Sequence, residues 1–446
     1  MRSGIFDLLD GFDAAAVGAG IYGFAERAFP ICRSITGDGV RRTLDLLAEI
    51  VPGLERREVP TGTQVFDWQV PREWNVERAF LIDPHGRKRA DFAESNLHLL
   101  NYSVPVDRVM PLAELRPHLY SMPSRPEAIP YRTSYFKEHW GFCLAHRELE
   151  ALPEGDYRVL IESRLEPGHL SYGELFLPGD LPDTVLLSAH ICHPSLANDN
   201  LSALGVLARL GALLASLPAR RYSYRLVFAP GTVGAITWLA QNEAAARLIR
   251  HGLVAANLGD GGSFHYKRSR RGNAPIDRAV SLVLRDAGEP HAIEDFVPFG
   301  YDERQYNSPG FALDVGSLTR TPWGRYPEYH SSDDNLDLIR PEHLALSLRR
   351  YLEVVALLEA NRSYLNLSPM GEPQLGRRGL YSHIGGRDDG REFELALLWV
   401  LNQSDGENDL LAIAERSGAP FRRVADAARA LLDAGLLREA AFASRA

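Results

Sequence analysis

The sequence of 446 residues is poor in cysteine, in long apolar runs and in positive charge. Its three cysteines form no Cys-x-x-Cys pair, so we expect neither a disulfide framework nor a cysteine zinc knuckle. No apolar run approaches the ~18–20 residues that a membrane helix needs, and Asp7, Asp10 and Asp13 argue against a signal peptide. The 49 Lys and Arg against 58 Asp and Glu give a formal net charge of −9, which disfavours general binding to nucleic acid or anionic membranes. We therefore expect a cytoplasmic protein.

The residues that are present are typical of a folded protein with several domains. Hydrophobic residues make up 45% of the chain and charged residues 24%, the usual balance of a soluble globular protein. This composition excludes a disordered chain, a collagen and a coiled coil. At roughly 150 residues per domain, the length predicts about three domains.

The central part of the chain repeats a pattern of strand, turn and helix. Residues 184–189 form a buried-strand run, residues 201–217 an apolar helix, and residues 224–229 a second strand. This alternation predicts an α/β domain with a mainly parallel sheet. We assign residues 1–57 and 156–362 to it, as one discontinuous domain.

Two further modules differ in texture. Residues 58–155 are rich in Pro, Trp, Tyr and short alternating runs, which predicts an inserted β-rich domain. Residues 375–446 contain three helical segments with the spacing of a winged helix-turn-helix. From residue 391 onward there are seven Arg, no Lys and nine Asp or Glu, so this module has a net charge of 7 − 9 = −2. Because phosphate neutralisation needs a basic face, we expect a protein partner or self-association there, not nucleic acid.

The most informative residues follow the first predicted strand. His190 ends that strand, and His193 and the run Asn198-Asp199-Asn200 follow it before the next helix. Ligands of open parallel sheets bind beyond the carboxyl ends of the strands, and His and Asp suit Zn²⁺. The alternative is a polar loop in which Asn198, Asp199 or Asn200 caps the helix. His193 is either a spare ligand or a loop residue.

Two other segments favour a metal site. Asp260 follows the third strand, and His330 lies in a late polar run. Together with His190, the Asn198-Asp199-Asn200 turn and the run Tyr329 to Asn335, these residues resemble the co-catalytic zinc aminopeptidases. The resemblance implies one or two Zn²⁺ ions held by His190, Asp199, Asp260 and His330.

Longer segments are similar to one bacterial group of aminopeptidase-like proteins. Its members join the aminopeptidase-like domain to an inserted β-rich domain and a C-terminal winged helix. The resemblance implies a place in polysaccharide or secondary-metabolite biosynthesis. The matching segments are residues 30–37, 66–68 with Pro71, 96–98, 130–135 and 300–306.

The sequence departs from the peptidase pattern in two places. The usual His-x-Asp is His190-Ile191-Cys192, and the usual pair of glutamates after the second strand is replaced by Gly231 and Thr232. The water-activating base is therefore missing from its usual place. Glu303 is our candidate substitute; alternatively it is a loop carboxylate paired with Arg304.

Other residues have both a functional and a structural interpretation. Tyr131, Arg132, Tyr135 and Arg304 are candidate substrate-binding residues, since Arg suits a carboxylate or phosphate; an aromatic core edge with one salt bridge is the alternative. Cys192 could be a nucleophile, but a buried and inert cysteine is the more conservative interpretation. The basic run 266–272 could bind an anion or simply be a charged surface loop.

The leading hypothesis is a zinc-dependent hydrolase of the aminopeptidase type, acting on an amide or a small peptide-like conjugate. A degenerate peptidase that serves as a binding or scaffold protein is the first alternative, favoured by the missing glutamates. A DNA-binding regulator is the second, disfavoured by the acidic charge.

Overall fold

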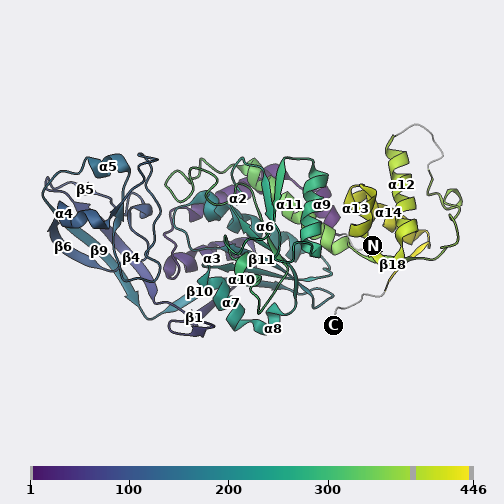
Figure 1. The fold of residues 1–446 in the computed structure, drawn as a ribbon, viewed down its shortest axis with the longest axis horizontal. Coiled ribbons are helices and arrows are strands. Elements are labelled where there is room, and N and C mark those ends of the chain that lie inside the picture. Colours follow the sequence, from purple (N-terminus) through teal and green to yellow (C-terminus); the bar gives the residue numbers. More distant parts are fainter. Residues whose placement is uncertain (1–3, 382–387, 441–446) are drawn as a thin grey trace. The chain divides into compact units, whose positions relative to one another are not determined.

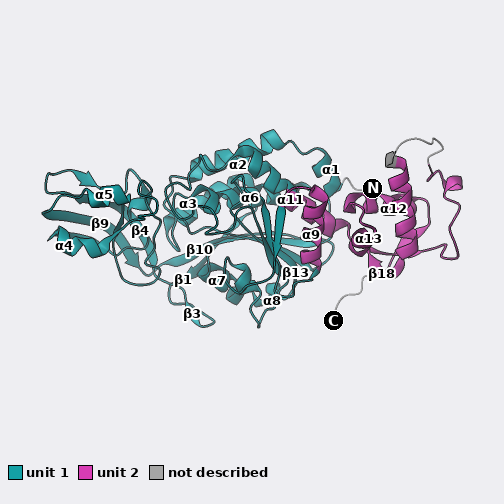
Figure 2. Ribbon diagram, turned by 45° about the horizontal axis from the view of Figure 1, so that its top comes forward, with its two compact units in different colours: residues 1–274, 291–349 teal, residues 275–290, 350–446 magenta. Residues whose placement is uncertain are grey.

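The structure is a computed structural model that describes residues 4–381 and 388–440. The described chain divides into two compact units, residues 1–274 with 291–349 and residues 275–290 with 350–446 (Figure 2). No helix among the described residues is both long and apolar enough to cross a membrane.

An eight-stranded sheet forms the centre of the first unit (Figure 1). Its four middle strands are parallel and the strands toward both edges include antiparallel pairs, so the predicted mainly parallel α/β sheet is confirmed. The strands lie in the order β1 (Glu55–Pro60), β10 (His169–Leu177), β12 (Ser223–Ala229), β11 (Thr184–His190), β13 (Ile249–Ala256), β16 (Val315–Thr319), β14 (Phe264–Lys267) and β15 (His291–Glu294).

Strand β11 occupies the middle of this sheet because it is apolar along its whole length. All seven of its residues are buried, as expected of a parallel strand covered on both faces. Helices α2, α3 and α6 lie on one side of the sheet and α7 on the other (Figure 2). The helices of this unit are α1 (Ile5–Asp10), α2 (Ala14–Ala28), α3 (Asp38–Ile50), α6 (Ala203–Ser216), α7 (Val233–Gln241), α8 (Glu243–Ala246), α10 (Glu303–Tyr306) and the start of α11 (Pro341–Ala360).

The β-rich insertion belongs to the same unit and contains a second, antiparallel sheet. Tyr157, Val159 and Ile161 of β9 are buried, and Val159 pairs with Leu81 of β4, so one face of this sheet belongs to a hydrophobic core that continues into the main domain at Leu186 and Val227. Strand β9 begins at Asp156, so the small sheet extends past residue 155, where the sequence placed the end of the insertion. Its strands are β5 (Lys88–Arg89), β4 (Glu73–Ile82), β9 (Asp156–Glu166) and β6 (Val106–Pro111), with helices α4 (Leu112–Leu115) and α5 (His146–Glu150) and the short pairs β2–β3 (Gln64–Val65, Trp68–Gln69) and β7–β8 (Leu119–Tyr120, Phe142–Cys143).

The second unit consists of a winged helix-turn-helix and α9 (Pro275–Ala287). The winged helix-turn-helix predicted from the sequence is confirmed. Arg278 of α9 pairs with Glu415, and Arg423 pairs with Glu392. Strand β17 (Ser363–Asn366) belongs to the three-stranded sheet of this module, so the module begins before residue 375, where the sequence analysis placed its start. Its other elements are α12 (Asp388–Gln403), β18 (Asp405–Asp409), α13 (Leu410–Ser417), α14 (Phe421–Asp433), β19 (Leu437–Glu439) and β17 (Ser363–Asn366).

A partly buried ion pair ties the insertion to the main domain. Glu73 of β4 pairs with Arg41 of α3 and also accepts hydrogen bonds from the His169 N–H (2.9 Å) and from Asn75 Nδ2 (3.0 Å). Burial alone would raise the pKa of Glu73, but the hydrogen bonds from Arg41, His169 and Asn75 outweigh it and lower the pKa to about 2.

Glu73→Gln should therefore destabilise the protein at neutral pH, by about 1–3 kcal/mol for a charged hydrogen bond lost from a shielded site. Since the folded pKa lies below the unfolded one, this contribution is present above about pH 4.5 and is lost as the pH falls toward 2. Urea unfolding of both proteins between pH 7 and pH 3 should show the two stabilities converging as the pH falls. Glu162→Gln, which removes the exposed pair with Arg78, is the matched control and should have a smaller effect. Equal effects of the two variants would contradict the prediction.

Candidate metal centre and adjoining pocket

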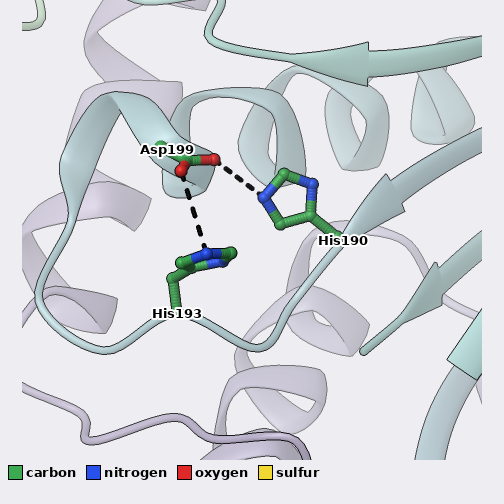
Figure 3. Close-up of side chains that lie close together, drawn as sticks. All are labelled: His190, His193 and Asp199. Carbon is green, nitrogen blue, oxygen red and sulfur yellow. Dashed lines mark hydrogen bonds and ion pairs between the residues drawn. The ribbon is translucent and has the colours of Figure 1, made fainter. Parts of the chain in front are cut away.

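Three imidazoles surround one buried carboxylate at the carboxyl end of β11. His190 Nε2 lies 2.8 Å from Asp199 Oδ1, and His330 Nε2 lies 3.0 Å from Asp199 Oδ2. His193 Nε2 approaches the same Oδ2 at 3.9 Å. Figure 3 shows the rings of His190 and His193 turned toward Asp199. Asp199 lies on the segment Ala197–Ser202, which brings its side chain back to the carboxyl end of β11.

This group of side chains fits a zinc ion. His190, His193 and Asp199 each offer one ligand atom, and these atoms lie within 4.8 Å of one another. Imidazole nitrogen and carboxylate oxygen are the donors that Zn²⁺ takes in proteins. The sequence left His193 open as a spare ligand or a loop residue, and the structure brings its ring into the group.

The electrostatics of the group favour ionised Asp199 with a neutral imidazole nearby. Burial would raise the pKa of Asp199, but His193 and His190 beside it hold that pKa well below its usual range. Burial lowers the pKa of His193 to about 3, so its ring is neutral at physiological pH. Burial also opposes protonation of His190, but Asp199 outweighs it and raises the pKa of His190. Protons should therefore compete with a metal mainly at His190.

Asp260 lies next to this group but is bound to other residues. Its carboxylate accepts hydrogen bonds from Asn198 Nδ2 (2.9 Å), the Gly262 N–H (2.6 Å) and Thr321 Oγ1 (2.6 Å). As a metal ligand, which the resemblance implies, Asp260 would have to release these donors. In the conformation described it fixes Asn198, the residue before Asp199.

Asn257, which the sequence analysis did not single out, directly follows β13 in a left-handed conformation with φ 49°. Its Nδ2 donates to Tyr301 Oη (2.7 Å) and its N–H donates to Asn200 Oδ1 (3.2 Å), whereas its Oδ1 is buried and has no hydrogen-bond partner among the described residues. In the sequence it stands inside the run 253–258, which predicts a strand, so no local signal singled it out.

Asp334, in the run 329–335, holds the backbone of Asp199. Asp334 is fully buried and accepts hydrogen bonds from the N–H groups of Asn198 (2.6 Å) and Asp199 (3.1 Å). Burial, and then the charge of Asp199, raise the pKa of Asp334 to about 7. The run 329–335 therefore supplies both His330 and the anchor of Asp199.

The loop that carries His193 is held by Arg33 from the segment 30–37. The buried guanidinium donates from Nε to the His193 carbonyl (2.7 Å), from Nη2 to the Pro194 carbonyl (2.7 Å) and from Nη1 to the Ala28 carbonyl (2.6 Å). These three bonds give that segment a structural role in the metal centre.

The inserted domain positions His330. The Tyr131 N–H donates to the His330 carbonyl (2.7 Å), the Ser332 N–H donates to the Ile129 carbonyl (2.8 Å), and Arg125 pairs with Asp333. His330 has φ 55°, a left-handed conformation that costs free energy for a residue other than glycine. The contacts from residues 125–131 offset that cost.

The loop 300–306 lies against the other side of the centre. The Tyr301 ring stacks on His190, with centroids 5.8 Å apart, and the Thr232 N–H donates to Asp302 Oδ1 (2.7 Å). Glu303 is fully buried and pairs with Lys267 of β14, not with the adjacent Arg304. Burial raises the pKa of Glu303, and the charge of Lys267 opposes that effect.

Three of the four cations in the basic run 266–272 are paired with carboxylates. Besides Lys267 with Glu303, Arg268 pairs with Asp295 and Arg271 with Asp314.

The Cys192 thiol lies beside Gly231, one of the two residues that replace the glutamates of the peptidase pattern. A Cβ added to Gly231 would meet Cys192 Sγ at 3.3 Å and His190 Cβ at 3.7 Å. The Gly231 N–H donates to Cys192 Sγ (3.2 Å), and burial raises the pKa of the Cys192 thiol to about 12. A buried thiol at that pKa is not a nucleophile at neutral pH.

A pocket of about 440 Å³ opens beside His193 and His330. All four candidate substrate-binding residues, Tyr131, Arg132, Tyr135 and Arg304, line it. The remaining lining residues are Ile35, Trp68, Thr133, Phe136, Cys192, Gly231 and Thr232.

Comparison with known proteins identifies the class. A family model described as a domain of unknown function, DUF4910, matches residues 22–361, and a winged helix-turn-helix model matches residues 362–439. The chain belongs to this DUF4910 family.

Two relatives share the whole architecture. A Clostridium acetobutylicum protein, provisionally named a polysaccharide biosynthesis protein with an aminopeptidase-like domain, is 48% identical over 426 residues, which cover 96% of this chain and 98% of the relative. A crystal structure from C. acetobutylicum, provisionally described as a peptidase, has a TM-score of 0.93 at 46% identity and covers 98% of this chain and 100% of that one.

The zinc aminopeptidase of Bacillus subtilis has a TM-score of 0.56 at 12% identity, with 77% of this chain and 94% of that one covered, which shows a shared fold. The predicted resemblance to aminopeptidase-like proteins with a C-terminal winged helix is confirmed.

Chemical labelling of the three thiols tests the interpretation of Cys192 as an inert cysteine. Burial raises the pKa of Cys32, Cys143 and Cys192 to about 12 in each case. In the folded protein at pH 8, an aromatic disulfide reagent should therefore react very slowly, and all three thiols should titrate at once after unfolding in guanidinium. Fast native labelling that peptide mapping assigns to Cys192 would revive the nucleophile interpretation.

Proposed function

We propose that this protein is a zinc-dependent hydrolase that cleaves an amide or a small peptide-like conjugate. The observation that carries the proposal is the convergence of His190, His193 and His330 on the buried Asp199. The shared fold with a zinc aminopeptidase supports it, and the name of the C. acetobutylicum relative suggests polysaccharide biosynthesis as the setting.

In the proposed site His190, His193, Asp199 and His330 would hold the zinc ion. Zinc supplies a Lewis acid that polarises an amide carbonyl and activates water. Asp334 and Asp260 hold Asn198 and Asp199 in place. Tyr131, Arg132, Tyr135 and Arg304 would hold the substrate in the adjoining pocket.

Glu303 is the proposed proton acceptor, from a fully buried position that does not line the pocket. One oxygen pairs with Lys267, while Oε2 has no hydrogen-bond partner among the described residues. A carboxylate whose pKa is raised by burial suits a general base. In the reaction the water oxygen bonds to the amide carbon, the C–N bond breaks, and the proton taken up by Glu303 passes to the leaving nitrogen.

We propose that the winged helix-turn-helix is a protein-interaction module. Residues 391–446 carry a net charge of −2 and Arg423 is paired with Glu392, which disfavours the basic face that DNA requires.

Metal content tests the site. Full-length protein purified without added metal should retain zinc, and His190→Ala, Asp199→Ala and His330→Ala should each lower zinc content and activity together. Because Asp199 raises the pKa of His190 and a ligand must be deprotonated, zinc affinity should fall as the pH drops through the histidine range. The exposed His85→Ala is the matched control. Full zinc occupancy in His190→Ala, or near-zero Zn, Fe, Mn and Co without tight rebinding, would be incompatible with the proposal.

The lost glutamates lead to a second expectation. Gly231 and Thr232 cannot take a proton from water, so hydrolysis of leucine anilide should be weak or absent. On an amide that the protein does cleave, Glu303→Gln should reduce kcat by about 10²–10⁴-fold while zinc stays bound.

Lys267→Met is the control, because it breaks the same ion pair but keeps the carboxylate. If Lys267→Met loses as much activity as Glu303→Gln, the ion pair matters and not the base. Brisk cleavage of leucine anilide would show that the missing glutamates are dispensable.

A further inference from the structure

The pocket beside the candidate metal centre is lined by positive charge, whereas the chain as a whole is acidic. Its lining includes two arginines, Arg132 and Arg304, and no aspartate or glutamate, although the whole protein carries a net charge of −9. We propose that the pocket selects conjugates bearing an anionic group, a carboxylate or a phosphate, next to an apolar ring; this inference rests on the proposed hydrolase function.

Arg304 has hydrogen-bond donors to spare. Its Nη2 donates to Thr232 Oγ1 (3.3 Å) and its guanidinium lies 5.7 Å from the centre of the Phe299 ring. Its Nε is buried and has no hydrogen-bond partner in the described part of the chain. The nearby carboxylate of Asp302 accepts the Thr232 N–H and does not line the pocket. Nε lies away from the pocket surface, so an anion in the pocket would bind the outer guanidinium nitrogens, whose planar geometry suits a carboxylate or a phosphate.

Arg132 supplies the second cation from the inserted domain. It is exposed on the segment 130–135, whose backbone is held by the Asn101 N–H donating to the Arg132 carbonyl (2.9 Å). Neither Arg132 nor Arg304 has an ion-pair partner within residues 4–381 and 388–440. The two guanidiniums come from two parts of the fold and line one cavity.

Aromatic side chains supply the apolar part of the pocket. Trp68, Tyr135 and Phe136 are 39%, 62% and 44% exposed, and the rings of Trp68 and Phe136 meet edge to face at 5.7 Å. Large aromatic side chains gathered at the rim of a cavity are typical of a binding surface. Their faces suit a ring or another flat apolar group.

The same charges disfavour an ordinary aminopeptidase substrate. The free α-ammonium of a peptide needs a carboxylate beside it, and the lining of this pocket has none. The Asp199 carboxylate is already engaged by His190 and His330. Two arginines would repel the ammonium, whereas an acylated nitrogen carries no charge. The preferred substrate is therefore an N-acylated, acidic conjugate.

Calorimetric titration of the full-length protein as purified tests this selectivity. Hippurate and its neutral carboxamide, N-benzoylglycinamide, share the ring and the amide and differ only in the carboxylate. We expect hippurate to bind about tenfold or more tightly, as charge-assisted hydrogen bonds to arginine should provide. Phenyl phosphate, with phenol as its neutral counterpart, decides whether phosphate or carboxylate is the better anion.

Arginine variants separate the pocket from the metal as the anion receptor. Arg304→Met and Arg132→Met should each reduce the hippurate preference to about threefold or less, Arg304→Lys should keep part of it, and the exposed Arg209→Met on α6 should leave it unchanged. Arg132 is exposed, so its variant should fold even if Arg304→Met does not; thermal unfolding checks both.

The outcomes distinguish this inference from the hydrolase proposal. A charge preference that depends on the arginines supports the pocket even if no zinc and no turnover are found. Zinc and turnover with equal binding of both probes would support the hydrolase and overturn the inference. Failure of hippurate to bind at 10 mM, or a preference that persists in both arginine variants, would also overturn it.

Discussion

The buried carboxylate of Asp199 is the constraint on which the centre depends. Its exposure is 1%, and a charge at that depth is strongly destabilising unless it is paired and hydrogen-bonded. His190 and His330 face its two oxygens, and Asp334 accepts its N–H. Two parts of the chain distant in sequence must therefore arrive together: residues 190–202, from the end of β11 onward, and the run 329–335. The parallel sheet makes this possible, because the carboxyl ends of its strands open to one edge.

The inserted domain is part of that requirement and not an appendage. His330 keeps its left-handed backbone because residues 125–131 bond to the run around it. Arg33 in turn holds the His193 loop, while Asn101 of the insertion accepts a hydrogen bond from Ser34 and donates to the Arg33 carbonyl. This interdependence agrees with a single family model that spans residues 22–361 across both domains.

Much of this arrangement could be predicted from local sequence. The apolar runs predicted β11 and β12, the rule that polar residues at strand ends form sites pointed to His190 and Asp199, and the resemblance to the zinc aminopeptidases pointed to His330. Predictions were weaker where contacts between residues far apart in sequence determine the local structure. The apolar run 253–258 continues two residues past the end of β13, so the sequence did not reveal that the chain turns at Asn257. The partners of His193 and Glu303 are Arg33 and Lys267, far away in sequence, and no periodicity connects them.

The departures from the peptidase pattern fit one another. Where glutamates would stand, Gly231 leaves room for the Cys192 thiol, and the Thr232 N–H is bound by Asp302. The neighbouring Tyr301 stacks on His190, and Glu303 is ion-paired. Random decay of a cleft would leave cavities or stranded charges, both of which destabilise a core. Here the loop 300–306 fills the space and its Glu303 is paired with Lys267, while the buried histidines and Asp199 remain at a cost that a purely structural core would not need. The filled space and the retained buried histidines and Asp199 together favour a remodelled binding site over a site that has lost its function.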